Sequence, residues 1–103
     1  MDERFIAERI TALRMKRNIS EYRMSLELGQ SKSYIQGITS GKALPSVKQL
    51  FNLADYFGIT MSEFFDENTD SPEKVHEITE LIKQLNDDDY DRILDFAKRL
   101  AQK

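Results

Sequence analysis

Three polar side chains with different hydrogen-bonding chemistry, Lys32, Ser33 and Gln36, lie within one short stretch of the chain. Lysine only donates, glutamine donates and accepts at the same time, and a serine hydroxyl can do either. Ile35 and Ile38 follow at helical spacing, so a helix here would be apolar on one side and polar on the other. Such a helix suits a DNA major groove, where lysine pairs with guanine and glutamine with adenine. The simpler alternative is that Lys32 is an ordinary exposed lysine on a solvated helix.

Two short helices joined by a tight turn are expected to position these side chains. Ser20 and Ser31 are predicted to cap the second and third helices, because serine accepts hydrogen bonds from the free amides of a first turn. Gly29 and Gly41 stand where each helix needs a left-handed residue to end. Two helices around a glycine turn form the helix-turn-helix pattern. Lys32 would then lie at the positive end of a helix dipole, and this locally unfavourable placement indicates a functional role.

The chain on either side of this pair also shows helical periodicity. A first helix is predicted over residues 5–17. Its apolar face comprises Ile6, Ile10 and Leu13. Ser46 is predicted to cap a fourth helix that runs to Phe57 and is stopped by Gly58. The expected apolar stripe of that helix comprises Val47, Leu50, Phe51, Ala54 and Phe57.

A short fifth helix completes the first part of the chain. Thr60 and Glu63 have the spacing of a capping box, and the helix is expected to end at Phe64 and Phe65. These two aromatic residues are interpreted as core or tail-packing residues. No segment alternates apolar and polar residues as a strand would, so the predicted fold class is all-α.

The polar residues 66–71 are poor in apolar side chains and are predicted to separate two domains. Residues 1–66 would form a five-helix domain, and residues 67–103 a C-terminal two-helix hairpin. Pro72 is well placed to begin the sixth helix, and the chain is expected to break and recap at Asn86 before the seventh.

Each tail helix is expected to carry an apolar face. On the sixth helix these residues are Val75, Ile78, Ile82 and Leu85, and on the seventh they are Tyr90, Ile93, Leu94, Ala97, Leu100 and Ala101. The spacing on the sixth helix is that of a heptad seam. Two short helices cannot bury such faces alone. The tail must therefore pack either on its own N-terminal domain or on a second copy of the chain, as a dimerisation element.

The charge of the chain is unevenly distributed. Residues 1–65 hold nine basic and seven acidic residues, a net +2, whereas residues 66–103 hold six and eleven, a net −5. Between Arg14 and Lys48 there are seven basic residues against two acidic ones. The overall charge of −3 therefore does not exclude nucleic acid, because the basic excess surrounds the helix pair.

Composition excludes several other classes of protein. The chain of 103 residues has no cysteine, which rules out disulfides and thiolate metal sites. No apolar run approaches the roughly 20 residues of a membrane span, and the first residues lack the apolar segment of a signal peptide. We therefore expect a soluble, cytoplasmic protein with no membrane association.

The ordered set of these signals resembles the lambda-repressor/Cro-like (XRE-type) helix-turn-helix family of bacterial and phage transcriptional regulators. The resemblance covers about residues 6–65. It is carried by Ile10 with Leu13 and Arg14, the segment 20–29, Ser31 with Ile35, Gly41, Pro45 with Ser46, and the ending GITMSEFF. In this family the third helix enters the major groove and the protein binds its operator as a dimer.

The resemblance implies roles for individual residues. Lys32, Ser33 and Gln36 are expected to contact bases. Phosphate contacts are expected from Arg14, Arg17, Ser31, Ser40 and Lys42. Dimerisation would place the two third helices about 34 Å apart, one turn of DNA, so the operator should be an inverted repeat.

Three residues depart from the family pattern. Glu21 replaces a glutamine that commonly reaches DNA, and an anion there repels phosphate. Thr39 replaces a glutamate that pairs with the first-helix arginine, so Arg14 is either held by another group or free to meet a phosphate. Gly37, on the polar side of the third helix, offers no side chain for base recognition.

The leading hypothesis is a sequence-specific DNA-binding regulator, a repressor that binds double-stranded DNA as a homodimer without a cofactor. The alternative is an antitoxin-like or adaptor protein that uses the same fold mainly to bind another protein. An enzyme is disfavoured. His76 is the only histidine and lacks the further ligands of a metal site, and residues 87–89 lack the glycine and distal glutamate of a calcium loop.

Overall fold

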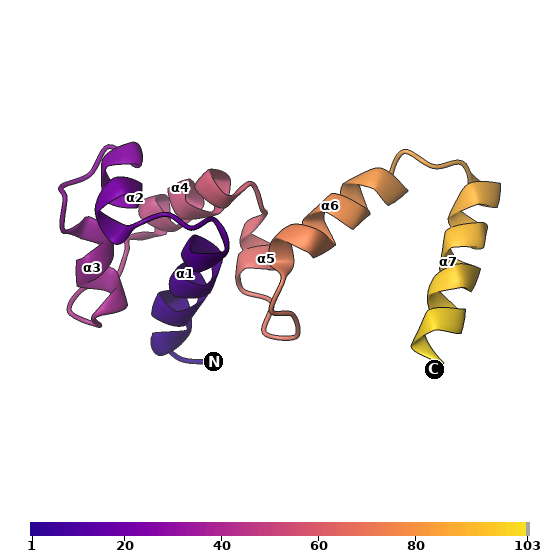
Figure 1. Cartoon of the computed structure of the whole chain (residues 1–103), viewed down its shortest axis with the longest axis horizontal. Coiled ribbons are helices and arrows are strands. Elements are labelled where there is room, and N and C mark those ends of the chain that lie inside the picture. Colours follow the sequence, from indigo (N-terminus) through magenta and orange to yellow (C-terminus); the bar gives the residue numbers. More distant parts are fainter. Residues whose placement is uncertain (103) are drawn as a thin grey trace.

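Seven helices and no strand make up the part of the chain that the computed structural model describes, residues 1–102 (Figure 1). They are α1 (Arg4–Lys16), α2 (Glu21–Glu27), α3 (Tyr34–Thr39), α4 (Val47–Phe57), α5 (Met61–Phe64), α6 (Pro72–Ile82) and α7 (Asp87–Ala101). The predicted all-α class is confirmed, with five helices in the first part of the chain and two in the tail.

One cluster of ten buried apolar side chains packs the five helices α1, α2, α3, α4 and α5 together. It consists of Ile10, Leu13, Met24, Ile35, Ile38, Leu53, Ala54, Phe57, Ile59 and Phe64. Burying one such side chain contributes about 1.5–3 kcal/mol, with less for alanine. Because α2 and α3 have only seven and six residues, this packing, and not helix propensity, stabilises them.

Most predicted helix ends are confirmed. The Ser20 hydroxyl accepts a hydrogen bond from the Arg23 amide at 3.0 Å, and Ser46 and Thr60 each take part in a complete capping box. Gly29 and Gly41 have φ values of 73° and 82°, in the left-handed region that glycine adopts without a steric cost.

The prediction that Ser31 caps the third helix is wrong. A turn closed by the Tyr34 amide on the Ser31 carbonyl, at 3.0 Å, precedes the helix, and the cap position falls on Ser33, whose side chain makes no capping hydrogen bond. Lys32 therefore lies in this turn, before the first turn of α3, and the argument from the helix dipole does not apply to it.

The apolar stripe of α4 is also rotated from its predicted position. Val47 and Phe51 are 66% and 53% exposed, whereas Leu53, which was not predicted, is fully buried. Leu53 lies on the same side as Ala54 and Phe57, and Phe51 falls on the flank of that face. The buried stripe therefore keeps Ala54 and Phe57 from the predicted one and is rotated toward Leu53.

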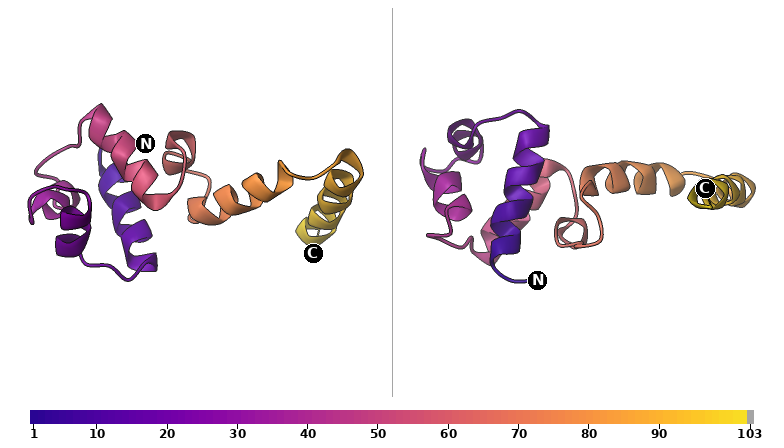
Figure 2. Two further views of the ribbon diagram at one scale, coloured as in Figure 1. Left: turned by 90° about the horizontal axis from the view of Figure 1, so that it is seen from above. Right: turned by 60° about the horizontal axis from the view of Figure 1, so that its bottom comes forward.

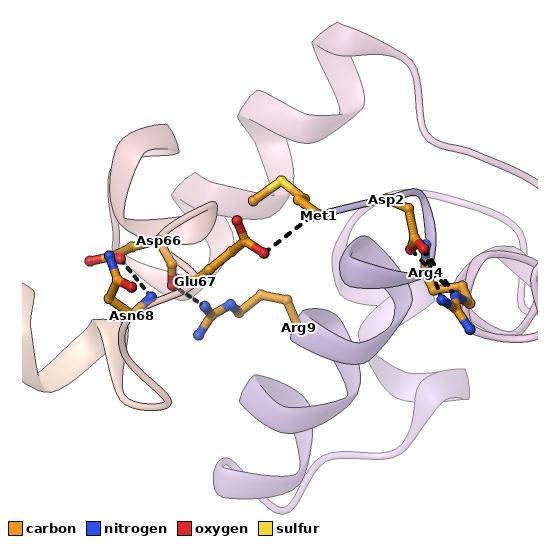
Figure 3. A network of polar contacts seen from close by, with 7 residues as sticks. All are labelled: Met1, Asp2, Arg4, Arg9, Asp66, Glu67 and Asn68. Carbon is orange, nitrogen blue, oxygen red and sulfur yellow. Dashed lines mark hydrogen bonds and ion pairs between the residues drawn. The ribbon is translucent and has the colours of Figure 1, made fainter.

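The polar segment 66–71 is folded against α1. The Arg9 guanidinium, 6% exposed, donates hydrogen bonds to the carbonyls of Asp66 and Thr69, and the N-terminal amino group lies 3.4 Å from the Glu67 carboxylate (Figure 3). The ring of Phe65 stacks on that of Phe5, with 6.0 Å between centroids. The start of the tail is thus attached to the first helix of the chain.

The tail then extends away from the N-terminal helices. Helix α6 packs against α5 at its beginning, with Pro72 buried at the first helical position, as predicted. The Asn86 side chain caps α7 by accepting from the Asp89 amide at 2.9 Å. Helix α7 lies at the far end of the molecule and turns away from α6, so the tail is an open pair of helices (Figures 1 and 2).

Candidate nucleic-acid interface

Helix α3 is fixed to α2 through the buried side chain of Ser25. Its hydroxyl donates to the Glu21 carbonyl at 2.7 Å and accepts from the Ile35 amide at 3.0 Å. The Ile35 amide belongs to the first turn of α3 and has no partner within its own helix. Ser25 therefore sets the position of α3 relative to α2 by a hydrogen bond.

The structure places the three predicted base-contacting residues on the solvent side of this helix pair. Ile35 and Ile38 are buried in the core, and Gln36 is exposed. Lys32 and Ser33 are exposed in the turn that leads into α3. These three side chains form a surface that we call the recognition face: Lys32, Ser33 and Gln36.

Gly37 borders the recognition face. It is half-buried, and no atom lies within 4 Å of the position that a Cβ would occupy, apart from its chain neighbours and its own helix. The glycine is therefore not required by packing within the chain. Because glycine has no side chain, no side-chain atoms project from α3 at this position next to Gln36.

Two residues that depart from the family pattern are hydrogen-bonded to each other. The Thr39 hydroxyl donates to the carboxylate of Glu21, joining the end of α3 to the first turn of α2. Both side chains are half-buried. The sequence marked each position separately, but only the fold brings them together.

Two predicted phosphate ligands are already engaged within the domain. The Arg14 guanidinium is half-buried and donates to the Ile19 carbonyl at 2.8 Å, so it is held by a backbone group and not by an acidic residue. Arg17 donates to the Tyr56 carbonyl at 2.8 Å and lies over the rings of Tyr56 and Phe57. Both contacts stabilise the end of α1 against its neighbours and reduce the freedom of these side chains to reach DNA.

The other predicted phosphate ligands lie on the surface. Ser31, Ser40 and Lys42 are exposed, and the Ser40 hydroxyl donates to the Gly37 carbonyl at 3.2 Å. Lys42 belongs to the loop between α3 and α4, beside the recognition face in sequence. Their contact with phosphate stays a prediction.

A network that the sequence did not predict uses a further basic residue. Glu27 accepts from the Tyr56 hydroxyl at 2.6 Å and from Arg23 Nε at 3.2 Å, which ties α2 to α4. Burial and the hydrogen bond to Glu27 raise the pKa of Tyr56 to about 12, because both favour the neutral phenol. Glu27 and Tyr56 are 29 positions apart in the sequence, so no local pattern predicts that their side chains meet.

These contacts divide the seven basic residues between Arg14 and Lys48 into two groups. Three of the seven basic residues, Arg14, Lys16 and Arg17, donate hydrogen bonds to groups outside their own helix, and Arg23 pairs with Glu27 within α2. The remaining three, Lys32, Lys42 and Lys48, are exposed, and within residues 1–102 none of them takes part in an ion pair. Of these three lysines, Lys32 belongs to the recognition face, Lys42 lies in the loop that follows α3, and Lys48 lies on α4.

A comparison with protein families identifies this arrangement. The helix-turn-helix family model matches residues 10–64, more than half of the chain and all of α2, α3 and α4. The chain belongs to the XRE-type (Cro/C1) helix-turn-helix family. No curated protein and no solved structure matches the chain. The match supports a DNA-binding regulator, and it confirms the resemblance that the sequence analysis stated.

Proteins of this DNA-binding family typically have no enzymatic activity. His76 is half-buried and lies 2.7 Å from the Glu63 carboxylate, so its ring joins α6 to α5. Residues 1–102 contain no group of side chains suited to a metal ion. Nor does any helix in that range have the length and apolar character that crossing a bilayer requires.

Proposed function

We propose that the protein is a sequence-specific transcriptional regulator that represses by binding an inverted-repeat operator as a homodimer. The recognition face carries this proposal, because it presents three contrasting hydrogen-bonding side chains opposite a buried apolar face that Ser25 fixes in place. Lys32 suits guanine O6 and N7, Gln36 suits adenine, and Ser33 can serve several bases. Lys42, Ser31 and Ser40 would hold the backbone on either side.

The tail supports the homodimer. Ile78 and Leu81 on α6 and Phe96 on α7 are 53%, 56% and 60% exposed, and α7 has no buried residue. Exposed apolar faces of this length favour association, because the free energy falls when apolar surface is removed from water. The predicted dimerisation residues belong to this tail, and all of them are exposed except the half-buried Ile82, although Leu85 lies beyond the end of α6: Val75, Ile78, Ile82, Leu85, Tyr90, Ile93, Leu94, Ala97 and Leu100.

A dimer also compensates for a short recognition face. Each base pair read by a good two-point contact contributes about 1–3 kcal/mol of discrimination, and one copy offers few such contacts. Two copies double the number of base pairs that are read. Selectivity for an operator is therefore expected to depend on the tail as well as on α3.

The experiment is selection from random DNA duplexes, followed by affinity measurement on the selected sequences. We expect an inverted repeat whose halves lie about one helical turn apart. Affinity should fall steeply between low and moderate salt, because bound lysines release counterions from the phosphates. Selection that enriches no sequence would refute the proposed function.

One observation favours a second function, protein binding. Leu44, Val47 and Phe51, before and on α4, are 58%, 66% and 53% exposed, so large apolar side chains are exposed outside the tail as well. An antitoxin-like or adaptor protein would use such a surface for a partner. Salt dependence separates the two functions, because binding through an apolar surface changes little with salt.

A further inference from the structure

Helix α6 is attached to the DNA-binding domain by hydrogen bonds between residues that are far apart in the sequence. They join α1, at the start of the domain, to the loop that precedes α6. Arg9 Nη1 donates to the Thr69 carbonyl at 3.0 Å, and Nη2 donates to the Asp66 carbonyl. Both bonds come from one nearly buried guanidinium, which also lies 4.9 Å from the centre of the Phe5 ring. A buried cation that loses these carbonyls would be left without compensation, so the bonds hold the loop strongly.

A second basic residue of α1 holds the next part of the chain. Lys16 Nζ donates to the Asp70 carbonyl, to Ser71 Oγ at 3.1 Å and to Glu73 Oε1 at 3.0 Å. All three hydrogens of the ammonium group are thereby used at the start of α6. Arg9 and Lys16 are seven residues apart, two turns of one helix, so they contact the loop at two separate points along α1.

The beginning of α6 is fixed from other directions as well. Pro72 is buried, and His76 Nδ1 lies 2.7 Å from Glu63 Oε1 on α5. Beyond His76 the exposed side chains Ile78 and Leu81 mark the part of α6 that leaves the domain. The first two turns of α6 are thus held by Lys16 on α1 and by Glu63 on α5, and from there the helix runs away from the helices α1 to α5 (Figures 1 and 2).

We propose that Arg9 and Lys16 are positioning residues that set the direction of α6 relative to α3, and so fix the spacing of the half-sites that a dimer recognises. The consequence for DNA rests on the proposed function, whereas the attachment itself is a property of the chain. A stiff connection between α6 and the domain narrows the range of separations that two recognition faces can reach, while a flexible one widens it. Arg9 and Lys16 would thus determine specificity without contacting DNA.

The attachment can be measured without DNA. Because the chain has no cysteine, spin labels can be placed at Asn52→Cys on α4 and Glu77→Cys on α6, two exposed positions. Excess unlabelled protein isolates the distance within one chain. We expect one narrow distance distribution, broadened by Lys16→Met and by Arg9→Met. Unchanged widths in both variants would overturn the proposal.

Matched controls separate the attachment from a general loss of charge. Lys83→Met removes a lysine paired with Glu80 on the same helix, and Arg4→Met removes an arginine paired with Asp2. Neither should broaden the distribution. Arg9 is buried, so Arg9→Met can unfold the domain, but Lys16 is 40% exposed and its replacement keeps the core intact.

The effect on spacing is measured with the selected operator and with a copy that has five extra base pairs between its halves. Five base pairs turn one half-site to the opposite face of DNA, so the wild-type protein should prefer the original by about tenfold or more. Lys16→Met should reduce that preference to about twofold while affinity for a single half-site stays unchanged. Broadened distances with an unchanged preference would overturn the role in spacing. Absence of any selective DNA binding by the wild-type protein would refute the proposed function, and the label distances would still decide whether the attachment exists.

Discussion

The hydroxyl of Thr39 at the end of α3 donates a hydrogen bond to the carboxylate of Glu21 in the first turn of α2. The two residues therefore act as one structural unit, although each by itself looks like a loss of a family feature. The unit braces α3 through an anion at the position where the family resemblance expects a glutamine that reaches DNA. Stability and DNA affinity then make opposite demands on Glu21.

Replacing Glu21 with glutamine should raise DNA affinity. The amide oxygen can still accept from Thr39, and the negative charge that repels phosphate is removed. We expect a gain of roughly two- to fivefold at low salt that shrinks as salt increases. Helix α2 should lose about 0.3–1 kcal/mol, because an anion in its first turn is favourable. Fluorescence anisotropy and urea unfolding measure the two effects. Glu77→Gln on exposed α6 is the control, and a lower affinity of Glu21→Gln would contradict this account.

Lys32→Ala and Gln36→Ala should each weaken binding to the selected operator by roughly tenfold or more, since one base contact contributes about 1–3 kcal/mol. Preference among sequences should relax at the base pair that the removed side chain contacts. Lys42→Ala should instead weaken binding to all sequences alike and lower the salt slope by about one unit. Titrations against single-base operator variants distinguish these outcomes. Variants that keep the wild-type affinity and preference would refute the recognition face.

Gly37→Ala should stabilise the protein while weakening its DNA binding. The added methyl group meets open space within the chain, and alanine favours a helix over glycine by up to about 1 kcal/mol. If α3 enters the major groove, the same methyl group occupies space next to Gln36 that a base edge approaches. Thermal unfolding and operator affinity, measured on one preparation, test both parts. Equal or better DNA binding by the alanine variant would show that Gly37 does not face the groove.

The combined variant Ile93→Glu and Leu100→Glu should convert a dimer to a monomer. Both side chains are exposed on α7, at 43% and 45%, so the change removes apolar contacts without disturbing the core of α1 to α5. Sedimentation at micromolar concentration gives the mass of the full chain. Asp91→Ala, on the same helix, should leave the mass unchanged. A wild-type protein that is monomeric at this concentration would refute the proposed role of the tail in dimerisation.

Acid should loosen the attachment of α6. Burial alone would raise the pKa of Glu73, but hydrogen bonds from its backbone and from Lys16 outweigh it and leave this pKa below the ordinary value of 4.5. A lowered folded-state pKa contributes stability that is complete above pH 4.5 and is lost as the pH falls through the folded-state value. The contribution is at most about 1 kcal/mol, since both partners are partly exposed.

Urea unfolding at several pH values measures this loss. Glu73→Gln should lower the free energy of unfolding at pH 7. Below pH 4.5, the free energy of unfolding of this variant should depend less on pH than that of the wild-type protein. Glu80→Gln, in a surface pair with Lys83, is the matched control. Parallel pH profiles of Glu73→Gln and the wild-type protein would show that Glu73 makes no such contribution.

The sequence by itself determined the features that depend on near neighbours. Ser20, Ser46 and Thr60 cap helices because the accepting oxygen and the donating amide are three residues apart, a distance that no distant packing has to supply. Helical periodicity likewise revealed Ile35 and Ile38 as the buried side of α3 and left Gln36 on the other. The helix order and the exposure of Gln36 opposite the buried side of α3 follow from such local rules.

Only the tertiary structure decided which polar groups meet. Arg9 contacts residues 57 and 60 positions away, and Glu21 meets Thr39 from 18 positions away, so no spacing rule links them. The same holds for the rotated stripe of α4, because Leu53 is buried by the neighbouring helices and Phe51 is not. Charge in the sequence likewise did not separate Arg14 and Arg17, which hold the fold, from Lys32 and Lys42, which face solvent. That division is a property of packing, since a cation becomes structural only where the fold brings an acceptor within its reach.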